Sequence, residues 1–297
     1  MALVETEIWP NLIDQAQQFK VPCLLINARL SEKSAKGYGK VHALSQGMLS
    51  GLDKLLAQDQ ATLDRFLNLG MPENRSQVLG SIKFDIHAPE SFIQQAERLK
   101  QDWNLSARKI ITIASTHAPE EQKLLNALKP YLTQHPEIVV IVVPRHPERF
   151  DEVLQIAQSL NLKTSRRSFG EVIEPNTQVY LADSMGEMWL WYALSQACFV
   201  GGSLNEPGGG HNILEPIALN VPTVLGKNYF NFQTIVDELV AVDGVKVVDD
   251  AEQAAKVLIE LLNDHVAAEQ LNQNAQKIML KNTGSLVKHI AVIDQYL

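Results

Sequence analysis

The residues best placed to do chemistry lie at 199–216, where an apolar strand runs into two groups of glycines. Residues 201–203 read Gly-Gly-Ser, and residues 208–210 are three glycines directly before a predicted helix. Glycine has no Cβ, so its backbone N–H can approach a ligand closely. A helix N-terminus adds unpaired N–H donors and a partial positive charge. The segment therefore predicts a site for an anion such as a phosphate.

Glu215, in the first turn of that predicted helix, narrows the class of ligand. A carboxylate repels a phosphate in direct contact, so the ligand should offer hydroxyl donors beside its phosphate. A nucleotide does so, with its ribose diol on Glu215 and its phosphate on the glycine amides. The candidate residues of this segment are Gly202, Ser203, Gly210, His211, Asn212, Ile213, Leu214 and Glu215.

A structural interpretation of the same segment is a helix cap. Asn212 and Glu215 have the spacing of a capping box. Pro216 is tolerated early in a helix because its missing N–H would have no intrahelical partner. Capping alone does not explain the density of glycines before the cap, which favours the ligand site.

Three other predicted strands also end in polar or glycine residues, and ligands of open α/β sheets bind outside the carboxyl ends of the strands. We expect these ends to face one crevice. The segments are Ser115-Thr116-His117-Ala118-Pro119-Glu120-Glu121, Pro144-Arg145-His146-Pro147-Glu148-Arg149 and Asp183-Ser184-Met185-Gly186-Glu187.

Arg145 presents a planar fork of donors that suits a phosphate or a base carbonyl. Its alternative is an exposed ion pair with Glu148 or Glu187. His146 could orient Arg145, contact the ligand or cap the turn. His211 could donate to the phosphate or make only local hydrogen bonds.

Met185 and Gly186 are candidates to face a base ring, since glycine permits close approach. The alternative for Met185 is ordinary core. Glu187 could be only a favourable first-turn acid. Trp189 and Trp191 are expected in the interior or at domain contacts.

The bulk composition excludes several classes of protein. The chain has 297 residues, 45% of them hydrophobic, and a formal net charge of −8 without a basic run, so we expect no nucleic-acid partner. No apolar stretch approaches the ~18 residues that span a bilayer, which predicts a soluble chain. Cys23 and Cys198 lie in apolar runs and are expected to be buried free thiols.

The motifs of metal and cofactor chemistry are missing. The histidines are scattered, no Asp-x-Asp motif follows a strand, and there is no P-loop lysine motif. Glycine amides, a helix terminus and an arginine would supply the positive field, so we predict metal independence and no cofactor.

Short apolar runs alternate with helical patterns, which predicts an α/β protein with doubly wound parallel sheets. The strands of the second part are expected at 110–114, 138–143, 179–182, 197–200, 223–225 and 245–248. Its helices are expected at 90–103, 120–132, 148–160, 186–196, 213–219 and 251–262. The first part has strands at 22–26, 54–57 and 77–80 and helices at 9–19, 35–49 and 60–69.

The first part is short for a doubly wound domain, and Leu3 and Val4 resemble the end of a strand. We therefore expect the chain to start partway through a domain. The predicted division is 1–88 for the rear part of a first domain, 89–284 for a nucleotide-binding domain and 285–297 for a last helix.

Taken together, five segments resemble the 3-deoxy-D-manno-octulosonic acid (Kdo) transferases of lipopolysaccharide biosynthesis. The resemblance runs in order from the first residues to about residue 235. The segments are Glu5-Thr6-Glu7-Ile8-Trp9-Pro10-Asn11, Asn27-Ala28-Arg29-Leu30-Ser31, 144–149, 183–187, and 201–203 with 209–216.

The resemblance implies a GT-B fold of two Rossmann-like domains, the first of them truncated here. It implies transfer of Kdo from CMP-Kdo to the lipid A precursor at the cytoplasmic face of the inner membrane, with inversion and without a bound metal. The implied CMP-binding segments are Pro144-Arg145, Met185-Gly186-Glu187 and Asn212-Ile213-Leu214-Glu215.

Glu5 and Lys83 match family positions that support the transition state. A cation near the leaving phosphate or the donor carboxylate would stabilise charge that develops there. Without the resemblance, Glu5 could be a helix-start acid and Lys83 a solvated charge at a strand end.

The chain also departs from the family. The membrane anchor, acceptor loop and general-base glutamate that open family chains have no counterpart here, so we expect weak or no transfer but retained CMP binding. The loop at 204–208 is one residue longer than usual, and Ala118-Pro119 stands where Pro-Gly is usual. The alternatives are a non-catalytic CMP-binding protein and a related GT-B enzyme that uses a UDP-sugar.

Overall fold

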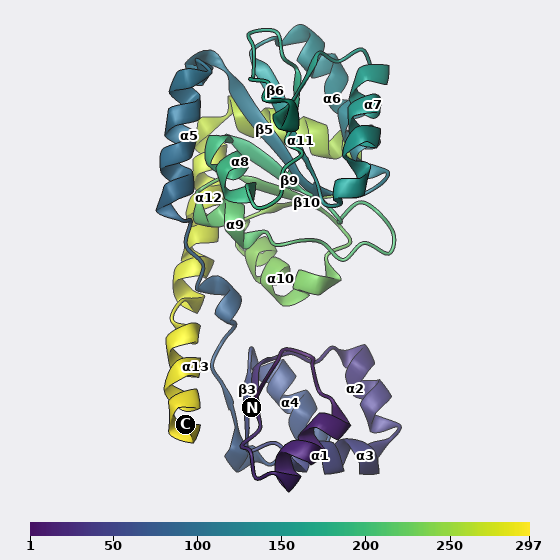
Figure 1. Cartoon of the computed structure of the whole chain (residues 1–297), viewed down its shortest axis with the longest axis vertical. Coiled ribbons are helices and arrows are strands. Elements are labelled where there is room, and N and C mark those ends of the chain that lie inside the picture. The colour runs from purple at the N-terminus through teal and green to yellow at the C-terminus, as the bar shows by residue number, and fades with distance from the viewer. The chain divides into compact units, whose positions relative to one another are not determined.

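The structure is a computed structural model that describes residues 1–297, and the chain forms two compact units. The first unit comprises Met1–Asp85 and Leu280–Leu297, and the second comprises Ile86–Met279. The chain thus leaves the first unit and returns to it within its last helices. Both units are parallel α/β structures, which confirms the predicted fold class (Figure 1).

The first unit contains a four-stranded parallel sheet in the order β1-β2-β3-β4. Its helices pack Ile13, Leu49 and Phe66 against the sheet in one apolar core. The strands are β1 (Ala2–Val4), β2 (Leu24–Ala28), β3 (Lys54–Ala57) and β4 (Ser76–Val78). The helices are α1 (Pro10–Gln18), α2 (Glu32–Gly39), α3 (His42–Ser50), α4 (Gln60–Asn68) and α13 (Ser285–Ile293).

The second unit is a doubly wound domain with a seven-stranded parallel sheet in the order β11-β10-β9-β5-β6-β8-β7. The strands are β5 (Lys109–Thr116), β6 (Ile138–Pro144), β7 (Thr164–Arg166), β8 (Val179–Leu181), β9 (Ala197–Val200), β10 (Thr223–Gly226) and β11 (Lys246–Val248). The helices are α5 (Glu90–Asp102), α6 (Glu120–Gln134), α7 (Phe150–Ser159), α8 (Met188–Leu194), α9 (Leu214–Ala218), α10 (Gln233–Ala241), α11 (Ala251–Asn263) and α12 (His265–Asn282).

The central strands β5 and β6 are buried on both faces, as their unbroken apolar sequences predict. Residues of α6, α7 and α11 form the core on one face of the sheet. Residues of α5 and α8 form the core on the other face (Figure 1). This two-sided cover fixes the strand ends that carry the polar segments.

Three details differ from the expectations. The helix expected at 35–49 is two helices, because the chain leaves the helical conformation at Val41, just after the poor helix formers Gly37 and Gly39. The polar three-residue edge strand β7 was not predicted, since it has no apolar run. Helices α10 and α12 were also not predicted.

Candidate active site

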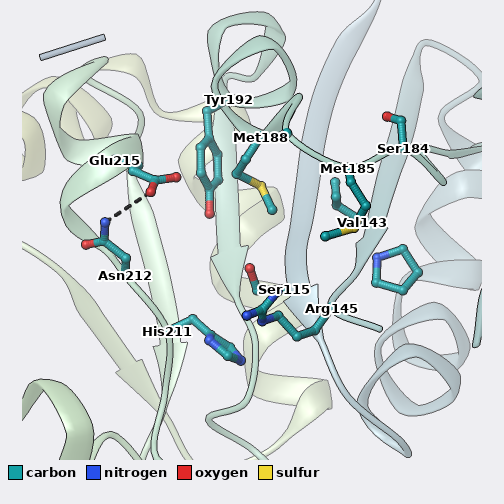
Figure 2. Close-up of a pocket in the computed structure, with 12 residues that line it drawn as sticks. Ser115, Val143, Arg145, Ser184, Met185, Met188, Tyr192, His211, Asn212 and Glu215 are labelled. Atoms are coloured by element: carbon teal, nitrogen blue, oxygen red, sulfur yellow. Dashed lines mark hydrogen bonds between the residues drawn. The ribbon is translucent and has the colours of Figure 1, made fainter. Parts of the chain in front are cut away.

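The second unit has a cavity of about 290 Å³ at the carboxyl ends of its central strands (Figure 2). It lies where the strand order reverses, between β5 and β9, which is the usual position of ligands in open α/β sheets. The lining residues are Ser115, Val143, Pro144, Arg145, Ser184, Met185, Gly186, Met188, Tyr192, His211, Asn212 and Glu215.

One wall of the cavity is apolar and comes from the β8–α8 segment. Met185 is 60% exposed, so it is not an ordinary core residue. Gly186 has φ of 81°, a conformation that glycine adopts without strain. Met188 and Tyr192 lie four positions apart on α8 and therefore share a face of that helix. This wall can pack against a flat apolar ring.

The opposite wall carries Glu215, in the first turn of α9. The Asn212 Nδ2 donates to Glu215 Oε1 at 3.1 Å, and Asn212 Oδ1 accepts from the Leu214 amide at 3.1 Å. Burial raises the pKa of Glu215, and the hydrogen bond from Asn212 partly offsets this. The predicted capping box is not formed, because the N-cap residue of α9 is Ile213, which makes no side-chain capping hydrogen bond. Asn212 instead holds one carboxylate oxygen of Glu215, and the second oxygen carries no hydrogen bond from the protein.

Arg145 is the cation of the cavity. Its side chain forms no ion pair: Glu148 lies 3.6 Å from His146 Nδ1, and Glu187 Oε1 is bound by Arg167 Nη2 at 2.8 Å. The alternative of a local ion pair for Arg145 is thus excluded. An exposed guanidinium without a carboxylate partner is available to an anionic ligand.

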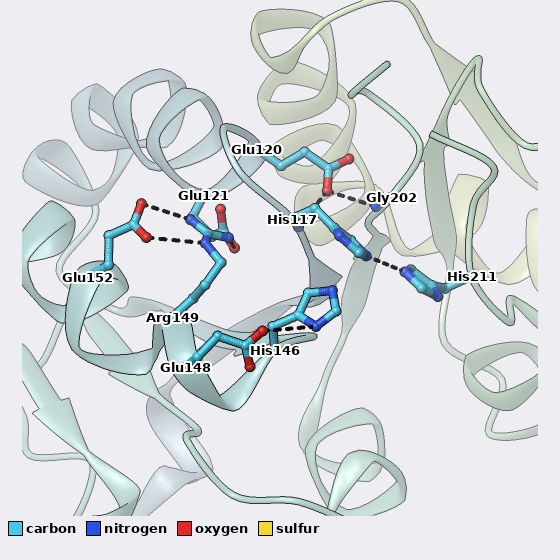
Figure 3. A network of polar contacts seen from close by, with 9 residues as sticks. All are labelled: His117, Glu120, Glu121, His146, Glu148, Arg149, Glu152, Gly202 and His211. Atoms are coloured by element: carbon cyan, nitrogen blue, oxygen red, sulfur yellow. Dashed lines mark hydrogen bonds and ion pairs between the residues drawn. The ribbon is translucent and has the colours of Figure 1, made fainter. Parts of the chain in front are cut away.

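The glycine amides have another role than the one predicted. The Glu120 carboxylate, which is 1% exposed, accepts the backbone N–H of Gly202 at 2.7 Å, Ser203 at 2.9 Å and Leu204 at 2.8 Å (Figure 3). The Gly210 amide donates to the Gly202 carbonyl at 2.8 Å. The expectation that these amides hold a phosphate is therefore corrected: an internal carboxylate occupies the nest that they form.

Comparison with known proteins identifies the family. The family model for 3-deoxy-D-manno-octulosonic-acid transferase matches residues 1–86, and that for glycosyl transferases group 1 matches residues 95–278. A 3-deoxy-D-manno-octulosonic acid transferase of Haemophilus influenzae is 38% identical over 296 residues, which cover 99% of this chain and 69% of that relative. The chain belongs to the Kdo transferase family.

Solved structures agree with this assignment. The C-terminal CMP-Kdo binding domain of WaaA from Acinetobacter baumannii is 61% identical and has a TM-score of 0.64, covering 64% of this chain and 99% of that domain. Anabaena HepE in complex with UDP, at 14% identity and a TM-score of 0.57, covers 96% of this chain and 75% of that protein, and shares the fold alone. The Kdo transferase chain has the GT-B type of glycosyltransferase fold. None of its helices is both long and apolar enough to span a bilayer.

In the first unit, the structure brings together the two residues that the family resemblance singled out. Lys83 Nζ lies 2.8 Å from Glu5 Oε1, and both side chains are partly exposed. Asn27, buried and with φ of 49°, donates to Glu5 Oε1 at 3.4 Å and accepts the Ile82 amide at 3.1 Å. Two segments 78 positions apart in this Kdo transferase, at Glu5 and Lys83, therefore form one polar cluster.

Several predicted site residues lie outside the cavity lining. Ile213 and Leu214 are fully buried core residues. Glu187 is held by Arg167 and by Ser184; burial raises its pKa, but these hydrogen bonds lower it by more. His146 lies beside the cavity rather than in its lining.

Other lining residues were not predicted from the sequence. Met188 and Tyr192 were assigned only to a helix, and their spacing of four was the available signal. Ser115, by contrast, begins a polar segment that was expected to face the crevice, and it does line the cavity. There β5 shifts register against β6 between Ala114 and Thr116, and Ser115 has φ of 53°. No sequence pattern indicated that irregularity.

Proposed function

We propose that this chain binds CMP-Kdo in the cavity of its second unit and acts in the transfer of Kdo to the lipid A precursor in lipopolysaccharide biosynthesis. The observation that carries the proposal is that one cavity combines the guanidinium of Arg145, which has no ion-pair partner, the carboxylate of Glu215, which has one oxygen available, and an apolar wall. The 61% identity to a domain described as CMP-Kdo binding supports it.

Each part of a cytidine nucleotide has a counterpart in the cavity. The ribose diol donates to the free carboxylate oxygen of Glu215. The cytosine ring packs on Met185 and Met188, with Gly186 allowing close approach. The phosphate lies toward Arg145, which supplies positive charge that metal-dependent transferases take from an ion, and His211 lines the same cavity.

The proposed reaction is a direct displacement that inverts the anomeric carbon. An acceptor hydroxyl oxygen forms the new bond to that carbon while the bond to the phosphate oxygen breaks. The electron pair of the broken bond leaves with CMP, and a base takes the hydroxyl proton. Arg145 stabilises the charge that develops on the leaving phosphate.

We assign Glu5 and Lys83 a supporting role in the same reaction. Their ion pair holds an ammonium group at a fixed place in the first unit. A cation so placed lowers the energy of a transition state in which negative charge develops. The acceptor is proposed to reach the protein from the inner-membrane surface on its cytoplasmic face.

Calorimetric titration of the chain with CMP, and separately with UMP and UDP, tests the proposal. We expect CMP to bind and the uridine nucleotides to bind at least tenfold more weakly. A preference for UDP would overturn the choice of donor and favour a UDP-sugar enzyme.

A second measurement separates an enzyme from a binding protein. Incubation with CMP-Kdo and lipid A precursor should release CMP in proportion to Kdo-modified lipid. CMP binding without any turnover, in the presence of membranes, would identify this chain as a nucleotide-binding module.

A further inference from the structure

Three histidines converge beside the proposed donor cavity from three neighbouring strand ends (Figure 3). His117 follows β5, His146 follows β6, and His211 follows the glycine loop after β9. The His117 and His211 rings lie nearly parallel, 6° apart, with centroids separated by 5.0 Å. The His146 ring meets His117 edge-on at 4.9 Å.

A hydrogen bond of 2.7 Å joins Nε2 of His117 to Nε2 of His211. One of the two nitrogens must therefore carry a proton and the other a lone pair. No hydrogen bond from the protein reaches Nδ1 of either ring. When His211 donates through Nε2, its Nδ1 can take up a proton and donate to a ligand.

The His211 ring packs directly against Gly202, where the absence of a Cβ leaves room for it. A Cβ on Gly202 would lie 2.8 Å from His211 Cδ2 and 2.9 Å from its Nε2. Any side chain at position 202 would therefore displace the imidazole. His211 also lines the donor cavity, so its exposed edge faces the ligand.

Burial, together with the neighbouring charges, keeps the two histidines neutral when no ligand is bound. Burial lowers the pKa of His211 to about 4, helped by His117, Arg145 and His146. Burial, then His146, lowers the pKa of His117, against the opposing effect of Glu120 and Glu121. Glu148 contacts this cluster of histidines only at His146, where its Oε1 lies 3.6 Å from Nδ1.

A Kdo donor carries two negative charges on neighbouring groups, a phosphodiester and the sugar carboxylate, whereas Arg145 supplies a single positive charge. We propose that the His211–His117 pair is a second anion subsite, in which His211 binds an anionic group of the donor as an imidazolium while His117 accepts its Nε2–H. This inference rests on the proposed function. His211 contacts the ligand, and His117 is a positioning residue.

The proposal predicts that a doubly charged donor binds together with one proton. The direction of the pH dependence follows from the pKa of His211, which is about 4 without a ligand and is raised by an anion bound at Nδ1. Between the free and the bound pKa, affinity should therefore increase about tenfold for each unit by which the pH falls. A ligand with one negative charge, satisfied by Arg145, should show almost no such slope.

The experiment compares CMP-Kdo with the methyl ester of CMP, by titration of the full chain between pH 8 and pH 5. The expected result is a slope for CMP-Kdo that approaches one once the pH is below the bound pKa of His211, and a slope near zero for the methyl ester throughout. His117→Phe, which cannot accept the Nε2–H, should abolish the slope and weaken CMP-Kdo about tenfold. His117→Gln should restore part of the slope and part of the affinity. His265→Gln, at an exposed position of α12, should change neither the slope nor the affinity.

Equal slopes for the two ligands in the unmodified chain would overturn the inference, as would an unchanged slope in His117→Phe. A requirement for Zn²⁺, seen as loss of CMP-Kdo binding in EDTA, would overturn it in favour of a metal site. Failure of both ligands to bind would overturn the proposed function as well. Binding with equal slopes overturns the inference alone.

Discussion

Glu120 accepts a hydrogen bond from the Gly202 amide at 2.7 Å, across 82 positions of the sequence. The same carboxylate binds the amides of Ser203, Leu204 and His117. It therefore ties the N-terminus of α6 to the segment that follows β9, on either side of the strand-order reversal. The walls of the donor cavity depend on that link.

We predict that Glu120→Gln destabilises the chain by about 2–4 kcal/mol, because an amide replaces charge-assisted acceptors and turns an N–H toward backbone donors. Urea unfolding followed by circular dichroism measures this. Glu260→Gln is the matched control, since that exposed residue makes only a 3.8 Å pair with Lys256. Equal effects of the two substitutions would contradict the structural role of Glu120.

A methyl group at Gly202 should impair both stability and donor binding. Gly202 has φ of 67°, which costs other residues about 1–2 kcal/mol, and its Cβ would collide with His211. Gly170→Ala is the control, because Gly170 has φ of 72° but open space around the Cβ position. Thermal unfolding should show a lower Tm in both variants. CMP titration should show weaker binding in Gly202→Ala only. If both variants lost CMP affinity equally, the contact with His211 would not be the cause.

Arg149 should be essential for stability rather than for binding. Its Nη1 lies 2.6 Å from Oε1 of Glu121, which is fully buried and has no partner at Oε2. Arg149→Met leaves a buried charge unpaired and should cost about 3–5 kcal/mol. Glu152→Gln removes the exposed partner of the same guanidinium and should cost less than about 1 kcal/mol.

Chemical denaturation of the two variants, and of Arg149→Met combined with Glu121→Gln, distinguishes the explanations. The combined variant should recover much of the loss, because no unpaired charge then remains. Additive losses would mean that Arg149 acts by packing alone.

The sequence predicted the fold where burial determines it. The apolar runs of β5, β6, β9 and β10 gave strands because both faces of a parallel sheet are covered. The edge strand β7, with the sequence Thr-Ser-Arg, carries no such pattern. The periodicity of apolar residues reflects burial, and a half-buried edge strand of three polar residues has almost no such periodicity.

The site was predicted less completely than the fold. Arg145, Met185, Gly186 and Glu215 could be placed in one cavity because they follow the carboxyl ends of parallel strands. The use of the Gly202 amide by Glu120 could not be foreseen. A glycine-rich turn forms the same nest for an internal carboxylate as for a phosphate, and only tertiary packing decides which anion fills it.

Glu215 provides the most direct test of how the nucleotide is held. If its free oxygen accepts from the ribose, the chain should bind CMP about 10-fold to 100-fold more tightly than 2′-deoxy-CMP, the range expected for a hydrogen bond to a charged group. Glu215→Gln should reduce that ratio toward one, whereas Glu148→Gln, on the exposed turn after β6, should preserve it. Because burial raises the pKa of Glu215, the preference depends on a carboxylate that is present only above that raised value. The ratio should therefore fall as the pH is lowered, starting at a higher pH than an exposed glutamate would require. Competition titrations of both nucleotides between pH 8 and pH 5 measure the ratio, and a preference that survives in Glu215→Gln would place the ribose elsewhere.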